Sequence, residues 1–244
     1  MHQQLLDQIS ELKLKGLKEA YLLQMQTPNY IHMPFEERLA HLIDAETINR
    51  KNCRIKQYLR AAKLKYRNAF LEDIEYLANR NLERSQIATL AKNQWIEQQH
   101  NIIIEGATGT GKTYIACALA HNAIVGGYSA YYARISKLLS EIKLVRADGS
   151  YLSFLKRLTK MRVLILDDFG VAPMDTRDAQ ELLEIIEDRV GSGSTIITSQ
   201  LPVENWHDYL SNGTVADAVL DRLVHNSYRL NLEGDTMRKR NKPV

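Results

Sequence analysis

The residues best suited to chemistry form one glycine-rich segment, Gly106-Ala107-Thr108-Gly109-Thr110-Gly111-Lys112-Thr113. The spacing G-x-x-x-x-G-K-T is that of a phosphate-binding loop. Its glycines let successive backbone N–H groups turn toward phosphate oxygens, and the following helix adds the positive end of its dipole. Lys112 would neutralise the β- and γ-phosphates, and Thr113 would supply a hydroxyl ligand for Mg²⁺. The alternative is a glycine-rich turn that matches the pattern by chance.

Two carboxylates follow an apolar run in the segment Arg162-Val163-Leu164-Ile165-Leu166-Asp167-Asp168. In open parallel sheets, ligands bind beyond the carboxyl ends of the strands. We therefore predict that Asp167 holds Mg²⁺ and that Asp168 orients or deprotonates the attacking water. The alternative, an acidic turn after a core strand, is weakened by the phosphate-loop pattern in the same chain.

Two further segments carry polar groups in positions that could serve the same site. The run Thr195–Gln200 is an apolar strand with polar residues at its end, so Ser199 or Gln200 could reach water near the γ-phosphate. A plain strand-end turn is the alternative. The segment 217–223 has helical spacing that exposes Arg222, although an ordinary Asp–Arg surface pair would look the same.

The secondary structure that must position these residues changes along the chain from helices to alternating strands and helices. The first third is helical, with a break at Thr27-Pro28-Asn29 and a second helix from Pro34 to about Tyr66. After residue 100, short apolar strands alternate with helical segments, which is typical of an α/β parallel sheet flanked by helices. We expect the strands at 101–105, 128–133, 162–166 and 194–199, and helices at 83–98, 114–123 and 176–190. The sequence thus predicts a small all-α N-terminal domain at 1–70 and a nucleotide-binding domain at 71–244.

The charge of the chain is unevenly distributed, although the net formal charge is only +3. Residues 1–70 carry 12 basic and 7 acidic groups, and residues 71–244 carry 20 and 22. One run contains eight cations and no acid: Arg50, Lys51, Arg54, Lys56, Arg60, Lys63, Lys65 and Arg67. A solvated helix face is the alternative, but the run favours phosphate contacts with duplex DNA. No base-reading motif is recognisable, so the predicted DNA binding is sequence-independent.

The overall composition excludes several other classes of protein. Apolar residues make up 45% of the chain and charged residues 25%, which are ordinary globular values. No window is long and apolar enough for a membrane span, and the N-terminus lacks the order of a secretion signal. The two cysteines, Cys53 and Cys117, have no metal-like spacing. We expect a reduced, cytoplasmic protein that has no membrane partner.

Several segments together resemble the IstB family of AAA+ ATPases, which help insertion-sequence transposases and are similar to the helicase loader DnaC and the initiator DnaA. They are GATGTGKT, LILDDFG, TIITSQLP, VADAVLDRLVHNSYRL and a short MRKR end. The resemblance implies ATP and Mg²⁺ as cofactors, bound by Gly106, Gly111, Lys112, Thr113 and Asp167. It also implies Asp168 as base, although many AAA+ proteins have the longer Glu there, and Gln200 or Ser199 as first sensor.

The same resemblance implies partners. Arg222 would be an arginine finger that reaches the nucleotide of an adjacent subunit, so an ATP-promoted homo-oligomer is expected. A DnaA-like extra helix, here residues 136–148 with Lys137, Lys143 and Arg146, would face DNA. Only twelve residues follow Leu232, too few for the full C-terminal lid of AAA+ proteins, so a second sensor has no secure position. Arg238 is a candidate, and a solvated basic tail is the alternative.

Three functions remain open at the level of the sequence. The first is an ATP-dependent assembly factor that binds duplex DNA and recruits or stimulates a transposase. The second is a DnaC-like loader whose N-terminal helices bind a replicative helicase. The third is a P-loop kinase for a small metabolite, which would work as a monomer without DNA; the acidic strand and the basic helix argue against it.

Overall fold

The computed structural model describes residues 2–210 and 213–237. The chain forms two compact units, Met1–Gln57 and Tyr58–Val244, which divide within helix α3 (Phe35–Ala61). The division lies earlier in the chain than residue 70, where the sequence analysis placed the domain boundary. Among the described residues, none of the helices combines the length and apolar composition that a bilayer crossing requires.

The first unit consists of α1 (His2–Glu11), α2 (Lys15–Gln26), the 3₁₀ turn η1 (Pro28–His32) and the first part of α3. Helices α2 and α3 approach closely at Gly16, where a side chain would collide with the Ala45 carbonyl. The nearby Glu46 carboxylate is buried and accepts a hydrogen bond from the Leu17 amide at 3.2 Å. A glycine and one buried acid therefore fix the packing of these two helices.

Helix α3 ends at Ala61, so the prediction that it continues to about Tyr66 is wrong. Lys63 has a left-handed backbone with φ of 52°, a conformation that no α-helix contains. Ala62 is buried, and its carbonyl accepts a hydrogen bond from the Tyr132 amide at 2.8 Å. Pairing with the edge of the sheet thus replaces the helical hydrogen bonds at this point.

The second unit contains a five-stranded sheet with helices between the strands. Its elements after α3 are η2 (Ala78–Arg80), α4 (Arg84–Ala91), α5 (Gln94–Glu97), β1 (Asn101–Gly106), α6 (Lys112–Val125), β2 (Ala130–Arg134), α7 (Ile135–Ala147), α8 (Tyr151–Thr159), β3 (Val163–Phe169), α9 (Thr176–Glu187), β4 (Ser194–Ser199), η3 (Val203–Asn205), α10 (Trp206–Tyr209), α11 (Gly213–Val224) and β5 (Ser227–Leu232). The helix predicted at 83–98 is in fact two short helices, α4 and α5, separated by Asn93 in a left-handed conformation.

All strand pairs are parallel, and the strand order is β2-β3-β4-β1-β5. This confirms the predicted α/β class with a parallel sheet flanked by helices. The four expected strands are present, and β5 is an additional strand at the sheet edge beside β1. The described residues after β5, 233–237, contain no α-helix.

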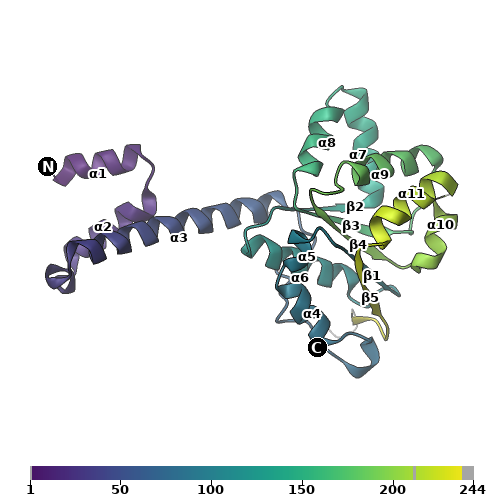
Figure 1. Cartoon of the computed structure of the whole chain (residues 1–244), viewed down its shortest axis with the longest axis horizontal. Helices are drawn as coiled ribbons and strands as arrows, with labels where there is room; N and C mark the ends of the chain where they lie inside the picture. Colours follow the sequence, from purple (N-terminus) through teal and green to yellow (C-terminus); the bar gives the residue numbers. More distant parts are fainter. Residues whose placement is uncertain (1, 211–212, 238–244) are drawn as a thin grey trace, which may run out of the picture. The chain divides into compact units, whose positions relative to one another are not determined.

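The sheet lies between two layers of helices (Figure 1). Helix α6 covers one face, and α7, α8, α9 and α11 bury a continuous apolar core on the other. The central strands β1, β3 and β4 are buried along nearly their whole length, as their apolar runs require in a sheet covered on both faces. Their carboxyl ends therefore meet at one edge, and this edge carries the chemistry described next.

Candidate nucleotide site

The glycine-rich loop joins β1 to α6, as its pattern predicted. Gly106, Gly109 and Gly111 have φ angles of 143°, 91° and 96°, which side chains at these positions would disfavour. A Cβ atom on Gly106 would also collide with the Leu232 carbonyl oxygen on β5. The loop can take this shape only with glycine at these positions, and it ends on the N-terminus of α6, where backbone N–H groups favour anions.

Lys112 is the first residue of α6, and its side chain turns back into the loop. The ammonium group donates to the carbonyl oxygens of Gly106 at 2.6 Å and Ala107 at 2.8 Å. The residue is only 8% exposed, so the cation is held among backbone dipoles inside the loop. A buried ammonium at the start of a helix is a strong site for phosphate oxygens.

Asp167 lies at the end of β3 and is fully buried. The hydroxyls of Thr113 and Thr198 donate to its Oδ1 at 2.7 Å and 2.6 Å, and the Tyr132 hydroxyl donates to Oδ2 at 2.6 Å. Burial alone would raise the pKa of this carboxyl, but these hydrogen bonds and the nearby Lys65 ammonium hold it below its usual value. Asp167 is therefore a carboxylate at neutral pH, in direct contact with the hydroxyl of Thr113.

The donors at this point suit a hard cation. Mg²⁺ prefers oxygen ligands and is commonly held by one or two protein oxygens, with water and phosphates completing the octahedron. The Asp167 carboxylate and the Thr113 hydroxyl are such a pair. Within residues 2–210 and 213–237, no cluster of three or more His, Cys, Asp or Glu side chains could hold a metal alone. The chemistry of the site thus fits a cation that arrives with a phosphate ligand.

Asp168 lies at an irregular point of β3, and its contacts differ from those of Asp167. The pairing of β3 with β4 shifts register between Leu166 and Phe169, and Asp168 has a left-handed φ of 61°. Its amide donates to the Thr198 hydroxyl at 3.1 Å, and its carboxylate pairs with the Arg134 guanidinium at 2.8 Å. Asp167 is thus buried, whereas Asp168 borders the cavity.

Ser199 and Gln200 have different surroundings, although the sequence analysis treated either as a candidate sensor. Ser199 is buried, and its hydroxyl donates to the carbonyls of Phe169 and Leu201 at 3.0 Å and 2.7 Å. Gln200 lines the cavity, and its Oε1 accepts a hydrogen bond from the Thr108 hydroxyl in the phosphate loop at 2.6 Å. Gln200 therefore lies at the cavity beside the phosphate loop, whereas the Ser199 hydroxyl contacts backbone carbonyls away from it.

The phosphate loop, Asp168 and Gln200 border one cavity of about 460 Å³, large enough for a nucleotide. Motifs in the sequence predicted its glycines, Thr108, Lys112, Thr113, Asp168 and Gln200. Other residues enter from segments distant in sequence and were not predicted, namely Lys65, Tyr66, Asp73, Ile74, Glu75, Arg80, Arg134 and Met237. Thr198 and Tyr132, whose hydroxyls donate hydrogen bonds to Asp167, were also missed. Thr198 could have been selected, because it belongs to the polar strand end already recognised.

Arg80 lies beneath the phosphate loop, and no sequence pattern pointed to it. It is 5% exposed, and its guanidinium donates to the Thr110 carbonyl of the loop at 2.7 Å and to the Glu75 carbonyl. Burial lowers the pKa of this group from its ordinary value. The amide of Glu233, just after β5, donates to the Arg80 carbonyl at 3.0 Å, and the Met237 amide donates to Gly109. The segment after β5 is thus hydrogen-bonded both to Arg80 and to the phosphate loop.

Arg222 lies outside the cavity lining, on α11. Its guanidinium pairs with Glu187 of α9 at 2.9 Å and donates to the Ala218 carbonyl at 2.9 Å. A position away from the chain's own nucleotide cavity is a requirement for an arginine that acts on another subunit. Arg238, the candidate second sensor, lies outside the described residues.

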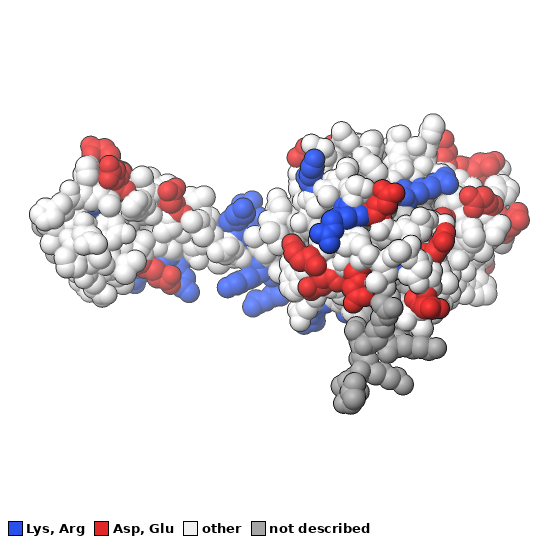
Figure 2. Space-filling view, turned by 90° about the horizontal axis from the view of Figure 1, so that it is seen from below, with Lys and Arg blue, Asp and Glu red and all other residues white. Residues whose placement is uncertain are grey.

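The cations of the run 50–67 fall into two structural groups. Arg50, Lys51, Arg54, Lys56 and Arg60 lie on α3, whereas Lys63, Lys65 and Arg67 follow its end. Basic side chains gather along this helix (Figure 2). Arg50 pairs with Glu46 at 2.7 Å, and among the described residues Lys51, Arg54, Lys56 and Arg60 form no ion pair. The basic run therefore does not lie on one helix, because α3 ends before Lys63.

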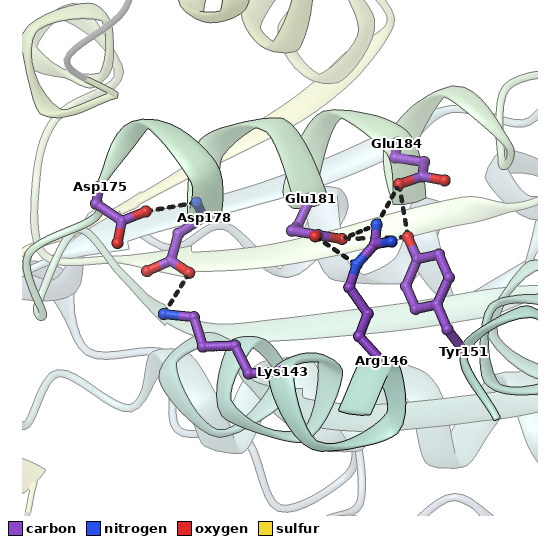
Figure 3. A network of polar contacts seen from close by, with 7 residues as sticks. All are labelled: Lys143, Arg146, Tyr151, Asp175, Asp178, Glu181 and Glu184. Atoms are coloured by element: carbon purple, nitrogen blue, oxygen red, sulfur yellow. Dashed lines mark hydrogen bonds and ion pairs between the residues drawn. The ribbon is translucent and has the colours of Figure 1, made fainter. Parts of the chain in front are cut away.

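The cations of α7 have a different environment (Figure 3). Lys143 pairs with Asp178 at 2.8 Å, and Arg146 pairs with Glu181 at 2.6 Å and Glu184 at 3.1 Å. The three carboxylates belong to α9, so these two predicted DNA-binding cations link two helices of the same unit. Lys137 is exposed and forms no ion pair with any residue that the structure describes.

Comparison with known proteins is consistent with this geometry. A family profile described as "IstB-like ATP binding protein" matches residues 7–244. An insertion-sequence ATP-binding protein of Sinorhizobium fredii is 38% identical over 96% of this chain and 95% of its own. The ATP-binding protein of insertion sequence IS1162 of Pseudomonas fluorescens is 45% identical over 83% of this chain and 87% of its own.

Solved structures share the fold at lower sequence identity. The crystal structure of the DnaC helicase loader has a TM-score of 0.56 at 20% identity and covers 68% of this chain and 97% of that protein. That of DnaI has a TM-score of 0.57 at 18% identity, with 72% and 93% covered. At these identities the likeness concerns the fold alone.

Proposed function

The chain belongs to the family of IstB-like ATP-binding proteins, and from this premise we propose that it is a Mg²⁺-dependent ATPase that assembles on duplex DNA and recruits or stimulates a transposase. The observation that carries the proposal is the contact between Thr113 and Asp167 at the mouth of the phosphate loop. It joins a phosphate-binding element to a metal-binding carboxylate, which is the combination that phosphoryl transfer from ATP requires.

The residues predicted from the motifs then each have a role in hydrolysis. The loop amides and Lys112 bind the phosphates, and Thr113 and Asp167 hold Mg²⁺. The metal, when bound, neutralises charge on the phosphates. Asp168 faces the cavity and orients or deprotonates the attacking water, with Gln200 as the sensor at the other side of the loop. The pKa of Asp167 lies below its usual value, which keeps it ionised for the metal.

We further propose that ATP joins subunits through Arg222. The residue is held by Glu187 and lies outside the cavity of its own chain, which supports action on a neighbouring subunit. An arginine finger of this kind stabilises the charge of the transition state and is worth roughly 10³–10⁵ in rate. A site completed by a second subunit would make ATP hydrolysis depend on assembly.

The DNA and transposase parts of the proposal rest on two kinds of support. The cations of α3 that form no ion pair could neutralise phosphates without reading bases. Relatives with 38% and 45% identity are named as ATP-binding proteins of insertion sequences. Their identity to this chain exceeds that of the helicase loaders, which favours transposition over helicase loading.

A subunit-mixing experiment tests the function and the arginine role together. Arg222→Ala should bind ATP but lose turnover by roughly 10³-fold or more, and Lys112→Ala should fail to bind ATP. Mixing the two inactive variants should restore turnover, because a Lys112→Ala subunit offers its arginine to an intact nucleotide site beside it. Arg177→Ala on α9 is the matched control and should keep full turnover.

Two results would contradict the proposal. Undiminished turnover in Arg222→Ala would remove the arginine from the mechanism. Wild-type protein that hydrolyses no ATP with Mg²⁺ and duplex DNA present would overturn the ATPase itself. Capture of a purified transposase, but not of a replicative helicase, on the ATP-bound complex separates the two DNA functions.

A further inference from the structure

The segment that follows α3 is fastened to the nucleotide-binding core, although it belongs by sequence to the basic run. The Ala62 carbonyl pairs with the Tyr132 amide of the edge strand at 2.8 Å. The rings of Tyr66 and Tyr114, the latter on α6, are 5.9 Å apart. The backbone of Lys65 and Tyr66 also contacts the buried thiol of Cys117 on α6. The backbone on both sides of Lys65 is therefore held in place.

This anchoring directs the Lys65 side chain into the nucleotide cavity. Its ammonium nitrogen lies 3.5 Å from Oδ2 of Asp167, and the side chain is 32% exposed. It lines the same cavity as Lys112 and Thr113. The two oxygens of Asp167 thus have different neighbours, with Thr113 on Oδ1 and Lys65 on Oδ2. Lys65 is the one member of the basic run that contacts the metal-binding carboxylate.

Binding of a divalent cation at Asp167 would change the balance of charge around Lys65. The ammonium and the metal would compete for the same carboxylate, and like charges at such short range repel. The strongest anion then within reach of the flexible lysine stem would be the terminal phosphate of a nucleotide bound beside Lys112 and Thr113. ADP lacks this group and would leave the ammonium with no new partner.

We propose that Lys65 is a γ-phosphate-binding residue of the nucleotide site, whose ammonium group moves from Asp167 to the terminal phosphate when Mg²⁺ and ATP bind. The inference rests on the proposed function and adds a specificity-determining residue to it. It removes Lys65 from the cations available to DNA. It also gives the site a means to distinguish ATP from ADP that lies outside the phosphate loop.

The test is equilibrium binding of nucleotides to the full chain, with Mg²⁺ present. Fluorescently labelled ADP and a labelled, non-hydrolysable ATP analogue are titrated into wild type, Lys65→Ala and Lys92→Ala. A charge-assisted hydrogen bond predicts that Lys65→Ala loses about 10-fold to 100-fold in affinity for the ATP analogue. Affinity for ADP should change by less than about 3-fold. Lys92, exposed at the end of α4, is the matched control and should bind both nucleotides as wild type does.

Three outcomes would overturn the inference. One is unchanged affinity for the ATP analogue, and another is an equal loss for both nucleotides. The third is a preserved preference for ATP together with weaker duplex binding, which would return Lys65 to the DNA-binding set. Lys65→Arg should recover part of the preference, and Lys65→Met keeps the apolar stem if the alanine variant unfolds early. Wild-type protein that binds neither nucleotide would overturn the proposed function instead, which keeps the two failures distinct.

Discussion

Helices α3 and α7 both carry clustered cations, yet the fold gives their charges opposite surroundings. On α7, Lys143 and Arg146 contact carboxylates of α9 at 2.8 Å and 2.6 Å (Figure 3). On α3, the described residues offer a carboxylate partner only to Arg50. A count of basic residues along the sequence therefore overstates the charge available on α7.

The difference comes from the row of acids on α9. Asp178, Glu181 and Glu184 are spaced by three residues, so they share one helix face, and the core turns that face toward α7. Counterion release from DNA depends on cations that can contact phosphates. A cation already bound to a carboxylate contributes less, because its partner brings a negative charge to the same place. We therefore expect α3 to dominate DNA binding and α7 to stabilise its own unit.

The largest effect should come from removing the charge of α3. We expect the combined substitution of Lys51, Arg54, Lys56 and Arg60 by Ala to weaken duplex binding about 100-fold at moderate salt. If all four cations contact phosphates, the slope of log affinity against log salt should fall by about 3.6, from roughly 0.9 per contact. Fluorescence anisotropy over a salt series measures both. An unchanged slope would mean that α3 is a solvated helix and that DNA binds elsewhere.

The corresponding variant of α7 should affect stability more than DNA binding. Lys143→Ala with Arg146→Ala leaves Glu181, only 7% exposed, without its cation. Loss of one partner of a largely buried pair is costly, so the melting temperature should fall by about 2–8 °C. Duplex affinity should change by less than about 3-fold, since the cations are already neutralised. A loss of affinity comparable with that of the α3 variant, at an unchanged melting temperature, would reverse our assignment of the two helices.

The smallest effect should come from neutralising the acids instead of the cations. Asp178→Asn with Glu184→Gln removes two negative charges and releases Lys143 from its ion pair. We expect duplex affinity to rise by about 2-fold to 3-fold at low salt, and the gain to disappear at high salt because the effect is electrostatic. Arg177→Ala on the same helix tests whether the salt dependence follows the local charge. A fall in affinity would show that the acids hold α7 in a DNA-binding position.

Local sequence patterns predicted the central strands and the phosphate loop. The edge strand β5 and the end of α3 depend on tertiary contacts. Strands β1 and β3 contain continuous apolar runs, β4 has Ile196 and Ile197 at its centre, and the phosphate loop has a pattern of its own. Strand β5 was missed because its buried residues Leu230 and Leu232 alternate with exposed Arg229 and Asn231, a weak signal at a sheet edge. The end of α3 was missed because no glycine or proline marks it; the Ala62 contact with the edge strand does.

In the candidate site too, some residues could be predicted from local motifs and others only from tertiary contacts. Thr113 and Asp167 were predictable, because each belongs to a motif whose spacing reflects its chemistry. Tyr132, Arg80 and Lys65 reach the site from distant segments, and no pattern within those segments indicates their partners. The register shift and the left-handed backbone at Asp168 also have no signal in two adjacent carboxylates of the sequence.

The two cysteines make the unmodified chain convenient for spectroscopy. Cys53 is exposed on α3, among the cations assigned to DNA, while Cys117 is buried and its pKa is raised to about 11 by burial. Since thiolates are the reactive form, a maleimide dye at neutral pH should label Cys53 alone. A single fluorophore would then report from the basic helix without any engineered substitution, and its signal could follow duplex arrival in real time.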